Sequence, residues 1–272
     1  QVRVDGGRAK METRLGAGQT VRLPPIASAG RPVEAASGDG AALHKMLLHK
    51  DDHVAVLNKP FGLAVQGGSG VTRHVDGMLE AWRDRKGRKP RLVHRLDRDT
   101  TGVLVVALTR SAAASLSEAF KGRDTEKTYW AVVRGHPSPP SGRLSTLIMR
   151  DPADGERMCV PAGKPKEAQR ATTLYDLLDR AGQLSLMEFH PVTGRTHQLR
   201  VHAAHLGIPI LGDPKYFNIE NWAFPGGLQN RLHLHARRIV APHPGGGMLD
   251  ITAPPSPHFA QALSVLGLST NG

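Results

Sequence analysis

The 272-residue chain has a single cysteine, Cys159, and no long apolar run. A single cysteine excludes a disulfide framework within the chain, suits a reducing cytoplasm and lacks the paired spacing of a zinc site. No apolar run approaches the roughly 20 residues that span a bilayer. No signal peptide opens the sequence, and its start at Gln1 suggests that residues precede it. We therefore expect a cytoplasmic protein with no membrane segment.

Several catalytic motifs are also missing. The sequence has no phosphate-binding P-loop, no dinucleotide-binding GxGxxG and no GxSxG elbow, which disfavours NTPases, Rossmann dehydrogenases and serine esterases of those kinds. His197, His202 and His205 lie on a predicted helix that holds no carboxylate and no HExxH motif. This favours polar packing and RNA contacts over metal binding, so we predict no metal site.

Negative charge is scarce. Lys and Arg number 36 against 24 Asp and Glu, a net charge of +12, which favours a nucleic acid partner over a merely soluble basic surface. Charge is densest in the segment RDRKGRKPR, residues 83–91. A solvated loop is the default interpretation of such a run, but its position just before a candidate site favours contacts with phosphates.

The pattern of turns and strands divides the chain into three parts. Residues 1–24 contain short strands, residues 25–42 are rich in Pro, Gly, Ala and Ser and predict a linker, and residues 43–272 form the main domain. In the main domain, many strands follow one another with few helices between them. This predicts an α+β fold with a large, mostly antiparallel sheet flanked by helices.

The stretch LVHRLDRDTTGVLVV, residues 92–106, places a polar turn before a continuous apolar run. The apolar run predicts a buried strand over 102–108, so Asp97 should lie at the mouth of that strand. Flanking Arg95 and Arg98 would hold its carboxylate ionised, as a nucleophile or general base requires. A turn aspartate that binds backbone N–H groups is the alternative, and Asp99 fits it better.

A helix is predicted over residues 196–207, because Leu199, Ala203 and Leu206 recur at helical spacing. Thr193 or Thr196 is the predicted N-cap. Arg195 then lies at the helix N-terminus, where the macrodipole disfavours a cation by roughly 0.3–1 kcal/mol. We expect a carboxylate or a phosphate to offset this cost.

Two further helices and a strand complete the expected framework. The helix over 111–120 has Ser111 as its predicted cap and Gly122 as its stop, and the last helix covers 257–267. The strand EKTYWAVVRG, residues 126–135, places Lys127 and Tyr129 on one face. Tyr129 is either ordinary core or a platform on which a base stacks.

Taken together, these motifs resemble the RluA family of pseudouridine synthases. VHRLDRDTTG is similar to the family signature around its catalytic aspartate, and KTYWAVVRG to its K-x-Y-x-A strand. GRTHQLRVHAAHLGIPILGDPKY, RLHLHA and VLNKPFGLAVQGGSG match its other motifs, in the family's order. The resemblance covers about residues 46–268. Residues 1–24 resemble the tail of the small RNA-binding domain, named after ribosomal protein S-four, that some members carry.

The resemblance implies the pseudouridine synthase fold and the isomerisation of uridine to pseudouridine in RNA. It implies that Asp97 is the catalytic aspartate, Tyr129 the active-site tyrosine and Arg195 the arginine paired with Asp97. No cofactor is implied. The implied partner is 23S ribosomal RNA or a pre-ribosomal large subunit, bound by a monomer. The predicted RNA-binding residues are His94, Arg95, Thr100, Arg83, Arg85, Arg88, Lys89, Arg91, Lys127, His197 and Arg200.

Two other classes of function remain open from the residues alone. A glycosidase would also use Asp97, but it needs a second acid at a defined separation. A non-catalytic RNA-binding protein would account for the charge and the N-terminal strands. Sequence also leaves open whether Asp97 would attack C1′ of the ribose or remove the C2′ proton.

Overall fold

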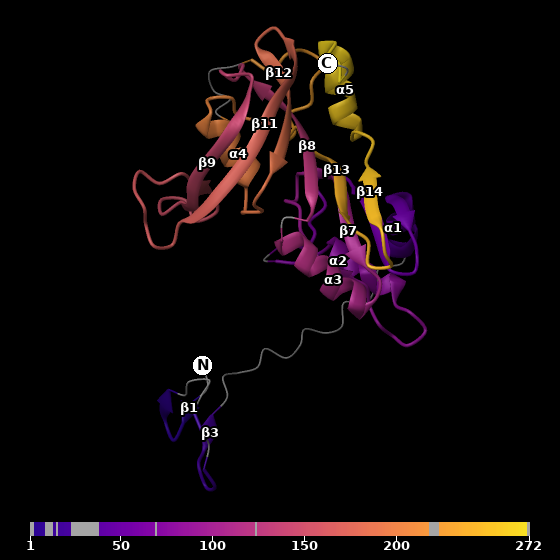
Figure 1. The fold of residues 1–272 in the computed structure, drawn as a ribbon, viewed down its shortest axis with the longest axis vertical. Helices are drawn as coiled ribbons and strands as arrows, with labels where there is room; N and C mark the ends of the chain where they lie inside the picture. The colour runs from indigo at the N-terminus through magenta and orange to yellow at the C-terminus, as the bar shows by residue number, and fades with distance from the viewer. Residues whose placement is uncertain are drawn as a thin grey trace. The chain divides into compact units, whose positions relative to one another are not determined.

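The structure is a computed structural model that describes residues 3–8, 13–14, 16–22, 38–68, 70–122, 124–217 and 223–270 (Figure 1). The chain forms two compact units, residues 1–35 and 36–272. In the first unit, β1 (Arg3–Val4) pairs antiparallel with β2 (Gly7–Arg8) and with β3 (Val21–Arg22). Residues 25–37 of the predicted linker lie outside the described residues.

The second unit begins earlier in the chain than the predicted main domain. Residues 39–42, predicted as linker, belong to helix α1 (Asp39–Lys45). Gly38 precedes this helix with a φ of 99°, which glycine adopts at little cost. Leu43 is fully buried in the core, and buried Asp39 is paired with Arg73 at 3.0 Å. These tertiary contacts hold an otherwise linker-like segment in a helix.

The elements of the larger unit have the following bounds. Its other helices are α2 (Val75–Met78), the 3₁₀ helix η1 (Leu79–Trp82), α3 (Arg110–Lys121), α4 (Gln198–His205) and α5 (Pro257–Leu266). Its strands are β4 (Leu47–Lys50), β5 (Val54–Lys59), β6 (Arg91–Leu92), β7 (Thr101–Ala107), β8 (Glu126–Arg134), β9 (Ser141–Arg150), β10 (Met158–Cys159), β11 (Gln169–Ala181), β12 (Leu184–Pro191), β13 (Leu234–Pro242) and β14 (Met248–Thr252).

One 11-stranded sheet joins these strands in the order β10-β9-β11-β12-β8-β13-β7-β5-β4, with β14 beside β13 and β6 beside β7. The β13–β7 pair is parallel, and the other pairs described are antiparallel. The predicted α+β fold with a large, mostly antiparallel sheet is therefore confirmed. No helix among the described residues is long and apolar enough to cross a membrane.

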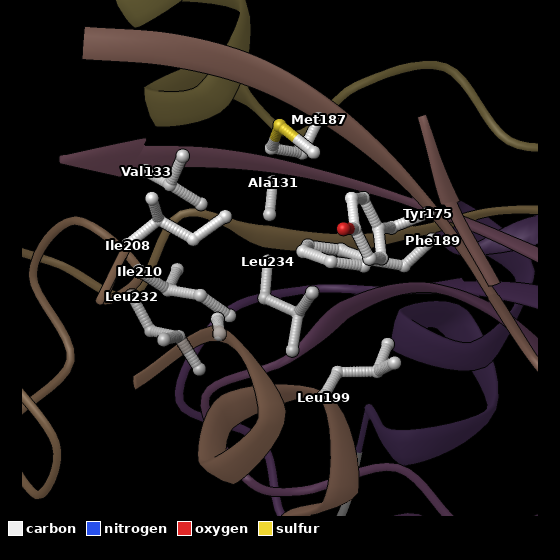
Figure 2. Close-up of a cluster of buried hydrophobic side chains, with 11 residues drawn as sticks. Ala131, Val133, Tyr175, Met187, Phe189, Leu199, Ile208, Ile210, Leu232 and Leu234 are labelled. Atoms are coloured by element: carbon white, nitrogen blue, oxygen red, sulfur yellow. The ribbon is translucent and has the colours of Figure 1, made fainter. Parts of the chain in front are cut away.

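Helices cover both faces of the sheet, as the alternation along β8 requires. Ala131 and Val133 point to one face, where they pack with Leu199 of α4 (Figure 2). Trp130 points to the other face and packs with Phe259 of α5. The sheet between them fixes where α4 lies, and α4 carries several of the predicted site residues.

The boundaries of α3 show how its cap is formed. Thr109, not the predicted Ser111, is the N-cap, because its hydroxyl accepts the N–H of Ala112 at 3.1 Å. The C-terminal stop at Gly122 is as predicted.

Gly102 allows β7 to approach β13 directly after the loop that carries Asp97. Its φ is 105°, and a Cβ there would lie 2.1 Å from the carbonyl oxygen of Ala236. We expect Gly102→Ala to lower the free energy of unfolding by at least about 3 kcal/mol, because strain and a backbone clash combine. Urea unfolding followed by circular dichroism measures this.

Gly246 provides the matched control for that substitution. Its φ is 104°, but nothing lies within 4 Å of a Cβ there. Gly246→Ala should therefore cost only about 1–2 kcal/mol of backbone strain. Equal losses in the two variants would contradict the close approach of β7 to β13.

Buried histidines should make the fold sensitive to acid. Burial lowers the pKa of His233 and of His235 to about 4, and Nε2 of His233 has no hydrogen-bond partner among the described residues. The unfolded chain binds protons at these side chains below about pH 6.5, whereas the folded chain does so only below about pH 4. Stability therefore falls as the pH drops between these values, by about 1.4 kcal/mol per pH unit for each histidine.

Urea unfolding between pH 7 and pH 5 tests this expectation. His235→Gln should flatten the dependence of unfolding free energy on pH relative to the wild type. An unchanged slope in His235→Gln would contradict the assignment.

Candidate active site

Asp97 lies in the loop between β6 and β7, at the mouth of β7 as the sequence predicts. The N–H of Thr100 donates to the carbonyl of Asp97 at 3.2 Å, which closes a turn. Leu96 is buried in the core and anchors the loop. The Asp97 side chain is 22% exposed, so its carboxylate is reachable from a cavity while its backbone is fixed.

The carboxylate of Asp97 is paired with Arg200, not with Arg195. Nη1 of Arg200 lies 3.3 Å from Oδ2 of Asp97. Arg200 also donates through Nε and Nη2 to the two oxygens of Asp213, each at 2.7 Å. The predicted contact between Arg195 and Asp97 is therefore wrong, and a second carboxylate, which the sequence analysis did not single out, completes the cluster.

Arg195 lies before α4 rather than in it. Its Nε donates to the carbonyl of Arg170 at 3.2 Å. The helix begins at Gln198 with His197 as N-cap, so neither Thr193 nor Thr196 is the cap. His197 has a φ of 52°, and this left-handed residue separates Arg195 from the helical turn that presents Arg200.

Electrostatics stabilise the charged form of Arg200. Its side chain is 6% exposed and that of Asp213 is fully buried. Burial alone would lower the pKa of Arg200, but the hydrogen bonds and negative charges of Asp213 and Asp97 outweigh it and raise that pKa. The ring of Tyr216 lies under the guanidinium, 5.1 Å from it. Arg200 was predicted to contact RNA, yet two carboxylates already engage it.

A cavity of about 380 Å³ opens beside Asp97. Tyr129, Leu199, Leu234 and Phe120 supply its apolar lining. Burial and the negative charge of Asp97 raise the pKa of the Tyr129 phenol, so the phenol is neutral at physiological pH. The volume of the cavity is within the range of small-molecule sites.

The charged lining of this cavity is mostly positive. Its cations are Arg95, Lys121, Lys127, Arg195 and Arg200, and Asp97 is the acid among its lining residues. Lys127 has no carboxylate partner among the described residues, and burial lowers its pKa. Such a lining favours a ligand that carries phosphate groups.

His94 is placed differently from the prediction. It lines the cavity, but its Nε2 accepts the N–H of Val105 at 2.8 Å and its ring stacks on Phe120. Burial, helped by the charge of Lys127, lowers the pKa of His94 to about 3. His94 therefore holds the loop against β7 as a neutral ring.

A second cavity, of about 530 Å³, is also lined by Asp97. It shares five lining residues with the first: Arg95, Leu96, Asp97, His197 and Arg200. Asp97 thus borders both cavities. Tyr129 lines only the first of them.

The basic run over 83–91 does not line either cavity. Arg83 pairs with Glu80 at 2.6 Å, Arg88 with Asp84 at 2.6 Å, and Lys89 with Asp76 at 3.1 Å and Glu80 at 3.2 Å. Arg85 and Arg91 are exposed. Neighbouring acids thus satisfy much of the charge that the sequence analysis assigned to phosphates.

Lys59 is a further residue that the sequence analysis did not single out. It is 1% exposed, and Nζ donates to the carbonyls of Pro60, Leu63 and Arg98 at 2.8–3.0 Å. Burial lowers its pKa to about 7, while the charges of Asp99 and Asp97 act in the opposite direction. Its bond to Arg98 ties the end of β5 to the loop that holds Asp97.

The arrangement provides one reachable carboxylate, a cation that fixes it, and an apolar cavity with a tyrosine. Within the described part of the chain, no group of three or more His, Cys, Asp or Glu residues is placed to hold a metal ion. A carboxylate so placed is suited to nucleophilic attack or proton removal at a ligand in the first cavity.

Comparisons with known proteins agree with this chemistry. The family model described as RNA pseudouridylate synthase matches residues 53–205. The chain is 42% identical over 264 residues to "Ribosomal large subunit pseudouridine synthase C" of Escherichia coli K12, covering 93% of this chain and 81% of that protein. It is 37% identical to the protein of the same name from Vibrio cholerae, over 97% of this chain and 84% of that protein.

Solved structures give the same result. "Human RNA Pseudouridylate Synthase Domain Containing 4" superimposes with a TM-score of 0.72 at 31% identity, over 86% of this chain and 98% of that chain. "Human RNA Pseudouridylate Synthase Domain Containing 1" gives 0.63 at 26% identity, over 83% and 96%.

Proposed function

Because the chain belongs to the RNA pseudouridylate synthase family and is an RNA pseudouridine synthase, we propose that it modifies uridines of 23S ribosomal RNA with Asp97 as the catalytic carboxylate. The observation that carries this assignment is the ion pair between Asp97 and Arg200 at the wall of a cavity that Tyr129 lines. The earlier resemblance to the RluA family is confirmed by the family match.

The reaction breaks the N1–C1′ bond of uridine and joins C5 to C1′, while C5 loses its proton and N1 gains one. Positive charge develops at C1′ when the glycosidic bond breaks, which an adjacent carboxylate stabilises. Asp97 serves either by attack on C1′ or by removal of the C2′ proton. Tyr129 holds the detached uracil in the cavity by stacking, because the ring must turn without escaping. A uridine in folded RNA must first be flipped out, at a cost of a few kcal/mol.

Cations at the cavity offset that cost by binding the phosphates that flank the flipped nucleotide. Arg95, Lys127 and Arg195 line the cavity, and none of them has a carboxylate partner among the described residues. We assign phosphate binding to these three side chains. His197 and Thr100 complete the wall next to the sugar.

The choice of ribosomal RNA rests on the relatives. The proteins that match over most of this chain carry the name of a large-subunit enzyme. We also propose that the protein acts as a monomer in the cytoplasm, on 23S RNA or on an assembling large subunit. Residues 1–24 are proposed to be part of an RNA-binding domain.

A glycosidase is disfavoured by the carboxylates near Asp97. Asp213 is fully buried and engaged by Arg200, so it is unavailable as a second acid. Asp99 is paired with Arg98 at 3.3 Å and lines the second cavity. A glycosidase needs a second acid on the other side of the sugar from the first, and neither Asp213 nor Asp99 is placed to serve as that acid.

The proposal is tested by incubating the protein with 23S transcripts, 16S transcripts, transfer RNA and partly assembled large subunits, followed by mapping of pseudouridines. We expect modified positions in 23S RNA, free or assembling, without release of uracil. Modification confined to 16S or transfer RNA would overturn the substrate assignment, and release of free uracil would indicate a glycosidase.

A further inference from the structure

Two donors approach the same oxygen of the Asp97 carboxylate. Nη1 of Arg200 lies 3.3 Å from Oδ2, and Nε2 of His197 lies 3.8 Å from that same atom. Oδ1 has no hydrogen-bond partner among the described residues. The two oxygens of one carboxylate are therefore unequal, and Oδ1 is the one left free.

His197 is held from its other side by Tyr216. Nδ1 of His197 lies 2.9 Å from the hydroxyl of Tyr216, and the two rings meet edge to face at 5.7 Å. That hydroxyl accepts the backbone N–H of Met158 at 2.8 Å. The His197 side chain is 13% exposed, and its φ of 52° is one that histidine rarely adopts. Backbone and side chain together fix the ring.

The contacts of the Tyr216 hydroxyl select the tautomer of His197. One lone pair accepts from Met158, and the hydroxyl hydrogen is free to be donated to Nδ1 of His197. A neutral imidazole that accepts at Nδ1 carries its hydrogen on Nε2, and Nε2 is the atom that faces Asp97.

Burial of His197 favours that neutral ring. Burial lowers its pKa, the negative charge of Asp97 opposes this, and the positive charge of Arg200 adds to it. The groups that face it from the neighbouring segments are Asp97, Arg200, Asp213, Lys215 and Tyr216.

We propose that Tyr216 and His197 are positioning residues that, with Arg200, hold Oδ2 of Asp97 and so dedicate Oδ1 to the ribose. The inference rests on the proposed function, since it assigns the reacting atom within it. At 3.8 Å the His197 contact is longer than a hydrogen bond. Catalytic contacts are often long in the free enzyme and tighten when substrate binds.

The division of the carboxylate serves both routes of the reaction. In one, Oδ1 forms a bond to C1′ while the N1–C1′ electron pair leaves with uracil. In the other, Oδ1 takes the C2′ proton, a C1′–C2′ double bond forms, and the same pair leaves with N1. Either step needs one carboxylate oxygen aimed at the sugar. If the carboxylate were free to rotate, that oxygen would be misplaced.

Tyr216→Phe is the first test, because it removes the hydroxyl but keeps the ring under Arg200. We expect the single-turnover rate of pseudouridine formation to fall about tenfold, with the RNA dissociation constant within about twofold of wild type. Tyr175→Phe, in a buried tyrosine of the core that lines neither cavity, is the matched control and should leave the rate unchanged.

His197 variants separate the side chain from the backbone. Asn tolerates the left-handed conformation but is too short to reach Asp97, whereas Gln strains the backbone and places an amide N–H near the position of Nε2. We expect His197→Asn to lose at least about thirtyfold in single-turnover rate and His197→Gln to lose less. If His197 had a purely structural role, His197→Gln would lose more of the single-turnover rate than His197→Asn.

The inference is overturned if the wild type is active and both Tyr216→Phe and His197→Asn form pseudouridine at a rate within about twofold of the wild-type rate. A loss that falls wholly in RNA affinity overturns it too. If the wild type forms no pseudouridine in any RNA tested, the proposed function itself fails, so the two failures are distinguishable.

Discussion

The Asp97→Asn variant is expected to lose at least about 10³-fold of the rate of pseudouridine formation while it binds RNA as tightly as the wild type. The amide has the size of the carboxylate but is a poor nucleophile and a poor base. Arg200 keeps its two bonds to Asp213, so its charge is still compensated and the fold should survive. The loss therefore reports on chemistry.

Tritium release from RNA labelled at uracil C5, measured under single turnover, gives the rate, and filter binding gives the affinity. Asp99→Asn is the matched control, because Asp99 lies two residues away in the same loop and pairs with Arg98. It should retain most of the activity. Tritium release by Asp97→Asn at the wild-type rate would contradict the catalytic role of Asp97.

The second large effect is expected at Arg200. Its guanidinium contacts Asp213 through two nitrogens and Asp97 through a third. Lysine carries the charge but not the planar fork, so Arg200→Lys cannot satisfy both carboxylates at once. We expect a rate about 10²-fold lower than wild type and a loss of about 1–3 kcal/mol in unfolding free energy.

Arg195→Lys is the control that separates the two arginines of the motif GRTHQLR. Arg195 is exposed and donates to a backbone carbonyl, so its replacement should change the rate only a few-fold, through weaker RNA binding. Both variants are compared at a temperature well below their melting points. A larger catalytic loss in Arg195→Lys than in Arg200→Lys would contradict the pairing described.

The arrangement of the sheet follows closely from patterns in the sequence. The apolar run after Thr101 and the alternation along Glu126–Arg134 each correspond to a strand. The order of apolar and polar residues within a short segment indicates whether one or both faces of a strand are buried. Leu199 and Ala203 are buried as helical spacing predicts. The start of β7 was predictable for the same reason, and so was the position of Asp97 just before it.

The partner of Asp97 was not predictable in this way. Arg195 and Arg200 are five residues apart in one motif, and the difference between them arises from the left-handed turn at His197. Histidine adopts a positive φ more often than most non-glycine residues, but still too rarely for the residue type to predict it. One signal was available: Arg200 lies on a predicted helix without acids, so its burial would need a carboxylate from elsewhere, which Asp213 provides.

The start of the second unit was missed for a related reason. Residues 38–42 are rich in Gly and Ala, a composition that local rules assign to a linker. Their helix is anchored by burial of Leu43 and by the ion pair of Asp39 with Arg73, and these contacts belong to the tertiary structure.

The most direct test is a crystal structure of Asp97→Asn bound to an RNA that contains its target uridine. We expect the flipped uridine in the cavity lined by Tyr129, with an atom of the residue 97 amide within about 3.5 Å of C1′ or C2′. That atom should occupy the position of Oδ1, with the other turned toward Arg200 and His197. A ribose that binds in the second cavity, or more than about 6 Å from residue 97, would contradict the catalytic role of Asp97.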